Sequence, residues 1–206
     1  MNTQPSLTHA APARAASRFL RWLLLAIVLA GTVQAQAESA TYVIDPAHTF
    51  VTFEVTHFGT STLRGRWDKK EGQVTIDRAA HTGRAQITID MQSVSTGTDA
   101  FNRFLLGKNG FNVAANPQAF FVATQFTFDG DNVASVTGEL TLNGKSGEAT
   151  LKATRFHCYT SPMLKTQVCG GDFETTIKRS DFGLTFGVPF VSDDTHLLIQ
   201  IEAIKQ

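Results

Sequence analysis

The chain has 206 residues, with 18 basic and 18 acidic side chains and a formal net charge of zero. This balance gives no reason to expect nucleic acid or an anionic membrane surface as a partner. The 16 Phe against two Tyr provide many large rings without a polar group, which indicates either a rich core or an apolar cavity.

Residues 1–37 have the three parts of a secretory signal peptide, which are a positive segment, an apolar run and a small-residue cleavage pattern. These parts are Arg14, Arg18 and Arg21, the run 22–30, and Ala35 with Ala37. The apolar run is shorter than the roughly 20 residues that cross a bilayer, so an uncleaved anchor is the less favoured alternative. We expect a cleaved leader and a periplasmic or extracellular mature protein.

The mature part, residues 38–206, has a length that suits one domain with a substantial core. Because the leader contains three arginines and no acidic residue, the mature part keeps 15 basic and 18 acidic side chains, a formal net charge of −3.

After the leader, apolar and polar residues alternate with a period of two, as in half-buried antiparallel strands. The pattern repeats over eight or nine segments, and turn sequences at 129–132 and 143–144 separate successive runs. A long meander removes its exposed edges by closing on itself. We therefore predict an all-β fold, an extended antiparallel eight-stranded barrel. The predicted inward residues are Val51, Phe53, Val55, Phe120, Val122, Phe126, Leu140, Ile199 and Ile201.

One stretch, residues 95–118, breaks this alternation. Phe101, Phe104 and Leu105 share a helical spacing, which predicts a short helix from Thr98 to Leu106 that ends at Gly107. We expect this helix to act as a lid or plug of the barrel. A second short turn is expected at 179–182, where Phe182 would help to seal the interior.

Both cysteines, Cys158 and Cys169, lie in the mature part. In an oxidising compartment this number favours one disulfide, and the absence of C-x-x-C spacing argues against a reactive thiol pair.

Motifs for catalysis or metal binding are missing. The histidines show neither H-x-H nor H-E-x-x-H spacing, and no G-x-S-x-G is present. A triad could be chosen from Asp45, His48 and the pair Ser180-Asp181, but any chain of this size allows such a choice. We expect no enzyme, no catalytic residue and no metal. We interpret His57 as a hydrogen-bonded histidine at a barrel mouth. The alternative is that its side chain contacts a polar head group of a ligand.

An eight-stranded barrel either fills its interior with its own side chains or holds one small ligand. The residue pattern alone leaves these two alternatives open.

Four segments of the mature chain resemble the YceI-like family of bacterial polyisoprenoid-binding proteins. The first contains Asp45, His48, His57 and Gly59. The others are FNRFLLGKNGFNVAANPQAFF, LTLNGKSGEATL and IKRSDFGL, and the similarity covers about residues 41–205. The loop between the two cysteines and the Lys-Ser-Gly run after Asn143-Gly144 depart from the family pattern.

The resemblance implies a lipocalin-like barrel around a long isoprenoid chain and a periplasmic role in transport or storage of a quinone or polyprenyl lipid. No cofactor is implied beyond that bound lipid. The wall would come from the inward residues named above, covered by Phe101, Phe104, Leu105 and Phe182. His57, Arg64 and Arg179 are the candidate head-group contacts. The resemblance also leaves room for a homodimer and for transient contact with a membrane or a membrane cytochrome.

Two other classes of function stay open. A hydrolase acting on lipids or amides in the same barrel would need a nucleophile and a base within hydrogen-bond reach. A stress or interaction protein with a filled barrel would have no internal cavity.

Overall fold

The computed structural model describes Met1 and residues 39–206. The predicted signal peptide lies outside these residues, so it stays a prediction. Among the helices of the described residues, none combines the length and the apolar composition that a bilayer crossing needs.

The described part is built almost entirely from antiparallel strands, with one α-helix and two short 3-10 helices. The strands are β1 (Ala40–Ile44), β2 (Phe50–His57), β3 (Ser61–Trp67), β4 (Lys70–Asp77), β5 (Thr82–Asp90), β6 (Val94–Ser95), β7 (Gln118–Asp129), β8 (Asn132–Leu142), β9 (Lys145–Thr160), β10 (Gln167–Lys178) and β11 (Val191–Lys205). The helices are η1 (Met91–Ser93), α2 (Asp99–Leu106) and η2 (Arg179–Phe182).

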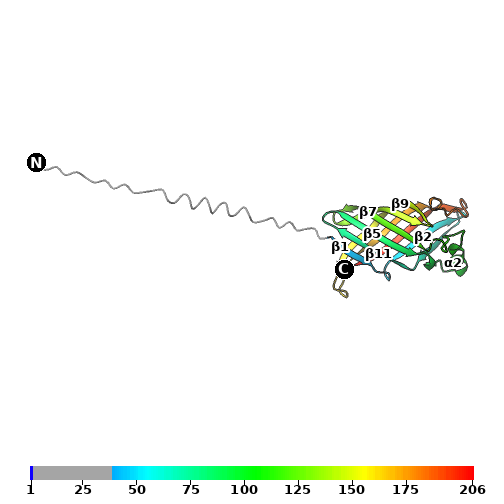
Figure 1. Cartoon of the computed structure of the whole chain (residues 1–206), viewed down its shortest axis with the longest axis horizontal. Coiled ribbons are helices and arrows are strands. Elements are labelled where there is room, and N and C mark those ends of the chain that lie inside the picture. Colours follow the sequence, from blue (N-terminus) through cyan, green and yellow to red (C-terminus); the bar gives the residue numbers. More distant parts are fainter. Residues whose placement is uncertain (2–38) are drawn as a thin grey trace. The chain divides into compact units, whose positions relative to one another are not determined.

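The sheet closes on itself. Its order runs β1-β4-β5-β7-β8-β9-β10-β11, and β11 pairs back with β1, so eight strands complete the circuit. The predicted all-β fold, an eight-stranded antiparallel barrel, is confirmed. Figure 1 shows α2 at one end of this barrel and the C-terminus at the other.

The three remaining strands extend the barrel toward α2. The long strand β11 pairs with β1 near its C-terminal end and with β2 over its first part, and β3 and β6 follow beyond β2. Consecutive pairs β1/β2, β3/β4 and β5/β6 therefore act as three long, interrupted strands. Counted this way, the whole barrel is an up-and-down meander in sequence order, as the tight turns predict.

The turn chemistry explains part of this register. Asn143 and Gly144 join β8 to β9 with φ values of 51° and 70°. Two successive positive φ values are what a two-residue hairpin turn requires, and Asn and Gly adopt them at low cost. This turn lies at the α2 end, where Asn143 Nδ2 donates to the carbonyl of Phe182 at 3.0 Å.

Helix α2 lies within one residue of its predicted bounds. Thr98 is its N-cap residue and Gly107 follows its last turn. Leu105 and Leu106 pack against the core, and the carbonyl of Leu105 accepts a hydrogen bond from the N–H of Phe111 at 2.6 Å. The helix is thereby held over the interior of the barrel.

The predicted disulfide is present. Cys158 on β9 and Cys169 on β10 are direct cross-strand partners, and their sulfur atoms are bonded. The bond therefore joins the two strands next to the loop 161–166, near the end of the barrel that holds the C-terminus.

Candidate binding cavity

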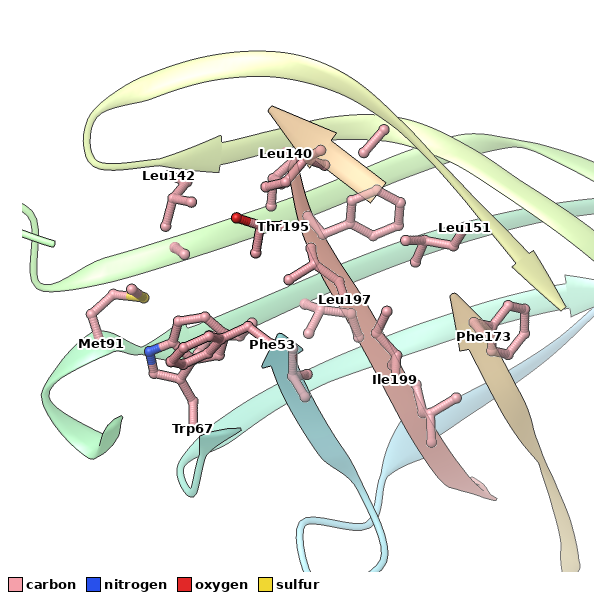
Figure 2. Close-up of a pocket in the computed structure, with 18 of the residues that line it drawn as sticks. Phe53, Trp67, Met91, Leu140, Leu142, Leu151, Phe173, Thr195, Leu197 and Ile199 are labelled. Atoms are coloured by element: carbon pink, nitrogen blue, oxygen red, sulfur yellow. The ribbon is translucent and has the colours of Figure 1, made fainter. Parts of the chain in front are cut away.

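The interior of the barrel is an apolar cavity of about 380 Å³. This volume falls in the range of small-molecule sites. Inward side chains of β2, β10 and β11 form part of the wall, and Figure 2 shows Phe53, Phe173, Leu197 and Ile199 facing it. Because the cavity exists, the alternative of a filled barrel is wrong.

Most of the predicted wall residues lie where the sequence pattern puts them. On the sheet, register explains this, since Val51 is opposite Ile199 and Phe53 is opposite Leu197, so that these pairs share the inner face. The predicted residues that line the cavity are Val51, Phe53, Val55, Phe101, Phe104, Leu105, Phe126, Leu140, Ile199 and Ile201. The candidate head-group residues His57 and Arg179 line it as well.

Two wall predictions on β7 are wrong. Phe120 and Val122 are exposed by 38% and 40%, and they lie on the outer face of the barrel. The inward residue is Phe121, which is opposite Ile87 on β5 and Leu140 on β8. A register shift between Ala123 and Gln125 then reverses the alternation, so Phe126 points inward although Phe120 and Val122 do not.

Phe182 is buried at the α2 end. Its side chain is only 3% exposed and is not among the residues that line the cavity. The ring lies against Gly147 of β9, where an added Cβ would come within 3.2 Å of it, and Gly147 is opposite the inward residue Leu140. Phe182 therefore packs on the inner face of the barrel and anchors η2 there, and its role as a seal stays a prediction.

Arg64 does not reach the cavity. It lies on the outer side of β3, where its Nε donates to Glu54 Oε1 at 2.6 Å. Glu54 and Arg64 are cross-strand partners, and the guanidinium lowers the pKa of the Glu54 carboxyl below its ordinary value, chiefly through this hydrogen bond. The expectation that Arg64 contacts a head group is corrected accordingly.

Arg179 lines the cavity, but four of its five N–H donors are already engaged. The guanidinium donates to the backbone carbonyls of Leu184, Phe186, Val191 and Ser192, at 2.6 to 3.0 Å. These carbonyls belong to the segment between η2 and the start of β11. Burial lowers the pKa of Arg179 below its ordinary value. The residue therefore holds the loop at the α2 end in place, beside the cavity.

An aromatic cluster forms one side of the wall. The ring centroids of Phe53 and Trp67 lie 5.0 Å apart, and Phe111 lies 6.1 Å from the first and 5.4 Å from the second. Gly65, opposite Phe53, makes this possible, since a Cβ there would fall 2.4 Å from the Phe53 ring.

Sequence reasoning missed several wall residues. They include Trp67, Met91, Phe111, Phe121, Phe173, Thr195 and Leu197. The alternation of β10 and β11 already put Phe173 and Leu197 on apolar faces, so this signal was available. The same signal was available for Met91, which continues the alternation of Ala85, Ile87 and Ile89. No periodic signal marks Phe111, because it lies outside the strands.

The hypothetical triad is not assembled. Ser180 Oγ donates to Asp193 Oδ2 at 2.8 Å, and its N–H donates to the other oxygen of Asp193. His48 is paired instead with Asp45, with 2.7 Å between Nδ1 and Oδ2. Among residues 39–206, no group of three or more His, Cys, Asp or Glu side chains is placed to hold a metal ion.

A closed up-and-down barrel around an apolar cavity defines the class of lipocalin-like binding barrels. Within that class the YceI-like domain family model matches residues 42–203, and the chain belongs to this family.

Sequence relatives have similar length. A UPF0312 protein of Pseudomonas paraeruginosa is 33% identical over 174 residues, which cover 83% of this chain and 90% of that protein. Protein YceI of Salmonella arizonae is 32% identical over 173 residues, covering 82% and 90%.

Solved structures show the same fold. Burkholderia cenocepacia BcnA is 29% identical with a TM-score of 0.65, over 78% of this chain and 99% of that one. A polyisoprenoid binding domain from Saccharophagus degradans has a TM-score of 0.57 and 18% identity, over 82% and 100%. At that identity the likeness concerns the fold alone.

Proposed function

We propose that this protein is a periplasmic binding protein that encloses a long isoprenoid lipid, of the quinone or polyprenyl type, for transport or storage. The apolar cavity inside the barrel is the observation that carries this proposal. The fold shared with a domain described as polyisoprenoid-binding supports the choice of ligand.

The energetics favour a hydrocarbon chain. Burial of apolar surface contributes about 25 cal/mol per Å², so about 500 Å² of buried lipid surface would contribute roughly 12 kcal/mol. Association costs of several kcal/mol leave enough for tight binding without any charged contact. A binding role needs only the apolar wall of the cavity. We propose no chemical reaction of the lipid.

The periplasmic location rests on two features. The first is the signal-peptide pattern of residues 1–37, and the second is the bond between Cys158 and Cys169, since disulfides persist in oxidising compartments.

Four phenylalanines at the α2 end, here called the aromatic rim, are the surface through which we propose lipid exchange with a membrane. They are Phe58, Phe104, Phe186 and Phe190. Phe58 and Phe190 stack at 5.5 Å, and Phe104 and Phe186 lie 5.1 Å apart. Phe104 and Phe186 also line the cavity, so the rim continues its wall outward. Exposed rings beside a lipid cavity suit a bilayer interface.

Lipid extraction from the exported protein, followed by mass spectrometry, tests the proposal directly. We expect an isoprenoid lipid in stoichiometric amount, and native mass spectrometry reports its mass together with the number of subunits. Repeated isolation without lipid, combined with failure to take up isoprenoids, would contradict the proposal.

A variant that fills the cavity sharpens this test. Ala149 is buried and lines the cavity, so Ala149→Phe is expected to lower isoprenoid affinity at least about tenfold. Val122→Phe adds a comparable ring on the outer face and is the matched control, with unchanged affinity.

A further inference from the structure

Two buried polar atoms of the cavity wall have no hydrogen-bond partner in the protein. Within residues 39–206 they are Trp67 Nε1 and Thr195 Oγ1. The two residues are only 5% and 7% exposed, and both line the cavity. Buried polar groups are nearly always paired, so each exception needs a physical explanation.

Other polar groups of the same wall are paired within the protein. Tyr42 donates its hydroxyl to Gln167 Oε1 at 2.6 Å, and Thr49 Oγ1 bonds to the backbone of Glu202. Arg179 is bonded to four carbonyls, as described above. The wall residues His57 and Asn109 are at least partly exposed, so solvent can reach them. Among the buried wall groups of residues 39–206, only Trp67 Nε1 and Thr195 Oγ1 lack a partner.

Both residues face the cavity from strands that flank β2. Trp67 on β3 is opposite Val51, and Thr195 on β11 is opposite Val55. In Figure 2 both side chains lie at the left of the view, on the same side as Met91 and Leu142, whereas Phe173 lies at the right. Leu142 precedes the turn at the α2 end, so both polar atoms lie toward that end of the cavity.

The surroundings of Thr195 contain no partner for its hydroxyl. Its cross-strand partners are Val55 on β2 and Ile177 on β10, both apolar. In that place a valine would fit the same space without an unpaired group. Retaining a hydroxyl there destabilises the empty barrel, which points to a contact made only when the cavity is occupied.

Each of the two atoms can bond to the same kind of ligand atom. An indole N–H only donates, and a hydroxyl donates or accepts, so an acceptor oxygen suits each position. The number of donors narrows the class further. Trp67 and Thr195 offer one donor each, and four of the five N–H donors of Arg179 are bonded to backbone carbonyls, so most oxygens of a phosphate at these positions would be desolvated without a donor.

We propose that Trp67 and Thr195 are two separate hydrogen-bonding positions in the cavity wall, each for a neutral oxygen of the lipid, either a hydroxyl or a carbonyl. The cavity then selects neutral oxygenated isoprenoids over a pure hydrocarbon and over a lipid whose buried head is a phosphate. This inference rests on the proposed lipid-binding function and names the class of lipid and the residues that select it.

Three probes separate these classes, namely the polyprenol solanesol, solanesyl phosphate and the hydrocarbon squalene. Delipidated protein is expected to bind solanesol more tightly than either of the other two. Thr195→Val and Trp67→Phe remove one polar group each. The variant at the position that the single solanesol hydroxyl occupies is expected to lower solanesol affinity about 3- to 10-fold, and both variants are expected to leave squalene affinity unchanged.

Two control variants separate hydrogen bonding from packing. Thr195→Ser keeps the hydroxyl and is expected to retain the preference for solanesol. Leu197→Met changes the same wall without a polar group and is expected to affect solanesol and squalene equally.

The stability of the empty protein provides an independent measurement. Because Thr195→Val removes an unpaired buried hydroxyl, its melting temperature without lipid is expected to equal or exceed that of the wild type. A purely structural role of the hydroxyl would lower it.

The outcomes are distinct. If neither variant lowers solanesol affinity relative to squalene, or if solanesyl phosphate binds more tightly and neither variant changes this, the hydrogen-bonding positions are overturned and the lipid-binding function stands. Failure of wild-type protein to bind any of the three probes would overturn the proposed function itself.

Discussion

The two ends of the barrel are built differently. At the end with the C-terminus, Cys158 and Cys169 join β9 to β10, and Tyr42 bonds to Gln167 across β11. At the α2 end, a helix, a 3-10 helix and a loop surround the cavity, and Phe186 and Phe190 are more than half exposed. Figure 1 shows these two ends at opposite sides of the strands.

This difference indicates a direction for lipid movement. The C-terminal end is tied by a covalent bond and a part-buried hydrogen bond, whereas the loop at the α2 end is held by hydrogen bonds without a covalent tie, chiefly the four from Arg179 and the one from the N–H of Phe58 to Phe190. Segments with fewer buried ties open at lower free energy. We therefore expect lipid to pass through the α2 end.

The largest effect is expected from Arg179→Met. Loss of four hydrogen bonds to backbone carbonyls should lower the free energy of unfolding by about 3 kcal/mol, measured by urea denaturation, and should speed proteolysis between residues 184 and 190. The matched control Arg64→Met removes an exposed ion pair and should cost less than about 1 kcal/mol. Equal costs for the two variants would contradict the assigned role of Arg179.

A slightly smaller loss is expected at the other end. Replacing Cys158 and Cys169 together by Ser should lower stability by about 2.5 kcal/mol, because the bond closes a short loop. Lipid exchange rates should stay unchanged, since the exit lies elsewhere. Wild-type protein under reducing conditions should match the double variant. Faster lipid release in the variant would show that the C-terminal end also opens.

Smaller still is the effect of the aromatic rim on transfer kinetics. Phe58→Ser together with Phe190→Ser should slow solanesol transfer from phosphatidylcholine vesicles about fivefold, at unchanged equilibrium affinity. Tyr159→Ser removes an exposed ring near the disulfide and is the matched control. If the rim variant changes subunit number rather than transfer, the rim is a contact between two copies.

The smallest effect concerns the pH dependence of stability. It comes from the pair Asp45 and His48, which lies between β1 and β2. The hydrogen bond from His48 lowers the pKa of Asp45 below its ordinary 3.8, and the same bond raises the pKa of His48 above its ordinary 6.5. The carboxylate contribution is present above pH 3.8 and is lost as pH falls through the lowered value. The imidazolium contribution is present below pH 6.5 and is lost as pH rises through the raised value.

His48→Gln should therefore lower the melting temperature slightly between these two pH values, and the difference should vanish at higher pH. His157→Gln, which removes an imidazole elsewhere on the barrel, is the control. A difference that is constant from acid to alkaline pH would contradict the paired state of His48. Neither variant should change lipid transfer, since the pair lies outside the cavity wall.

The errors on β7 show where sequence reasoning stops. Residues 119–123 are apolar at every position, so alternation alone cannot decide whether Phe120 or Phe121 faces inward. The decision comes from pairing, because Phe121 is opposite Ile87 and Leu140, which line the cavity. The register shift after Ala123 then places Phe126 inward, and no spacing in the sequence predicts this shift.

For the polar residues Arg64 and Arg179, too, the outcome depended on tertiary pairing rather than on local sequence. Both were equal candidates for a head-group contact, because the sequence does not show which group an arginine pairs with. Pairing places Arg64 opposite Glu54 on the outer face, and the loop after η2 surrounds Arg179 with carbonyls. Which partner a charge finds depends on residues far away in the chain.

By itself, the sequence determined the all-β meander, the short helix and most of the apolar wall, because strand alternation, turn residues and helical spacing are local properties of the chain. Only the tertiary structure decided that the interior is hollow, which arginine reaches it and where Trp67 and Thr195 are left without partners. These depend on closure of the barrel and on cross-strand register, which bring together residues that no local pattern connects.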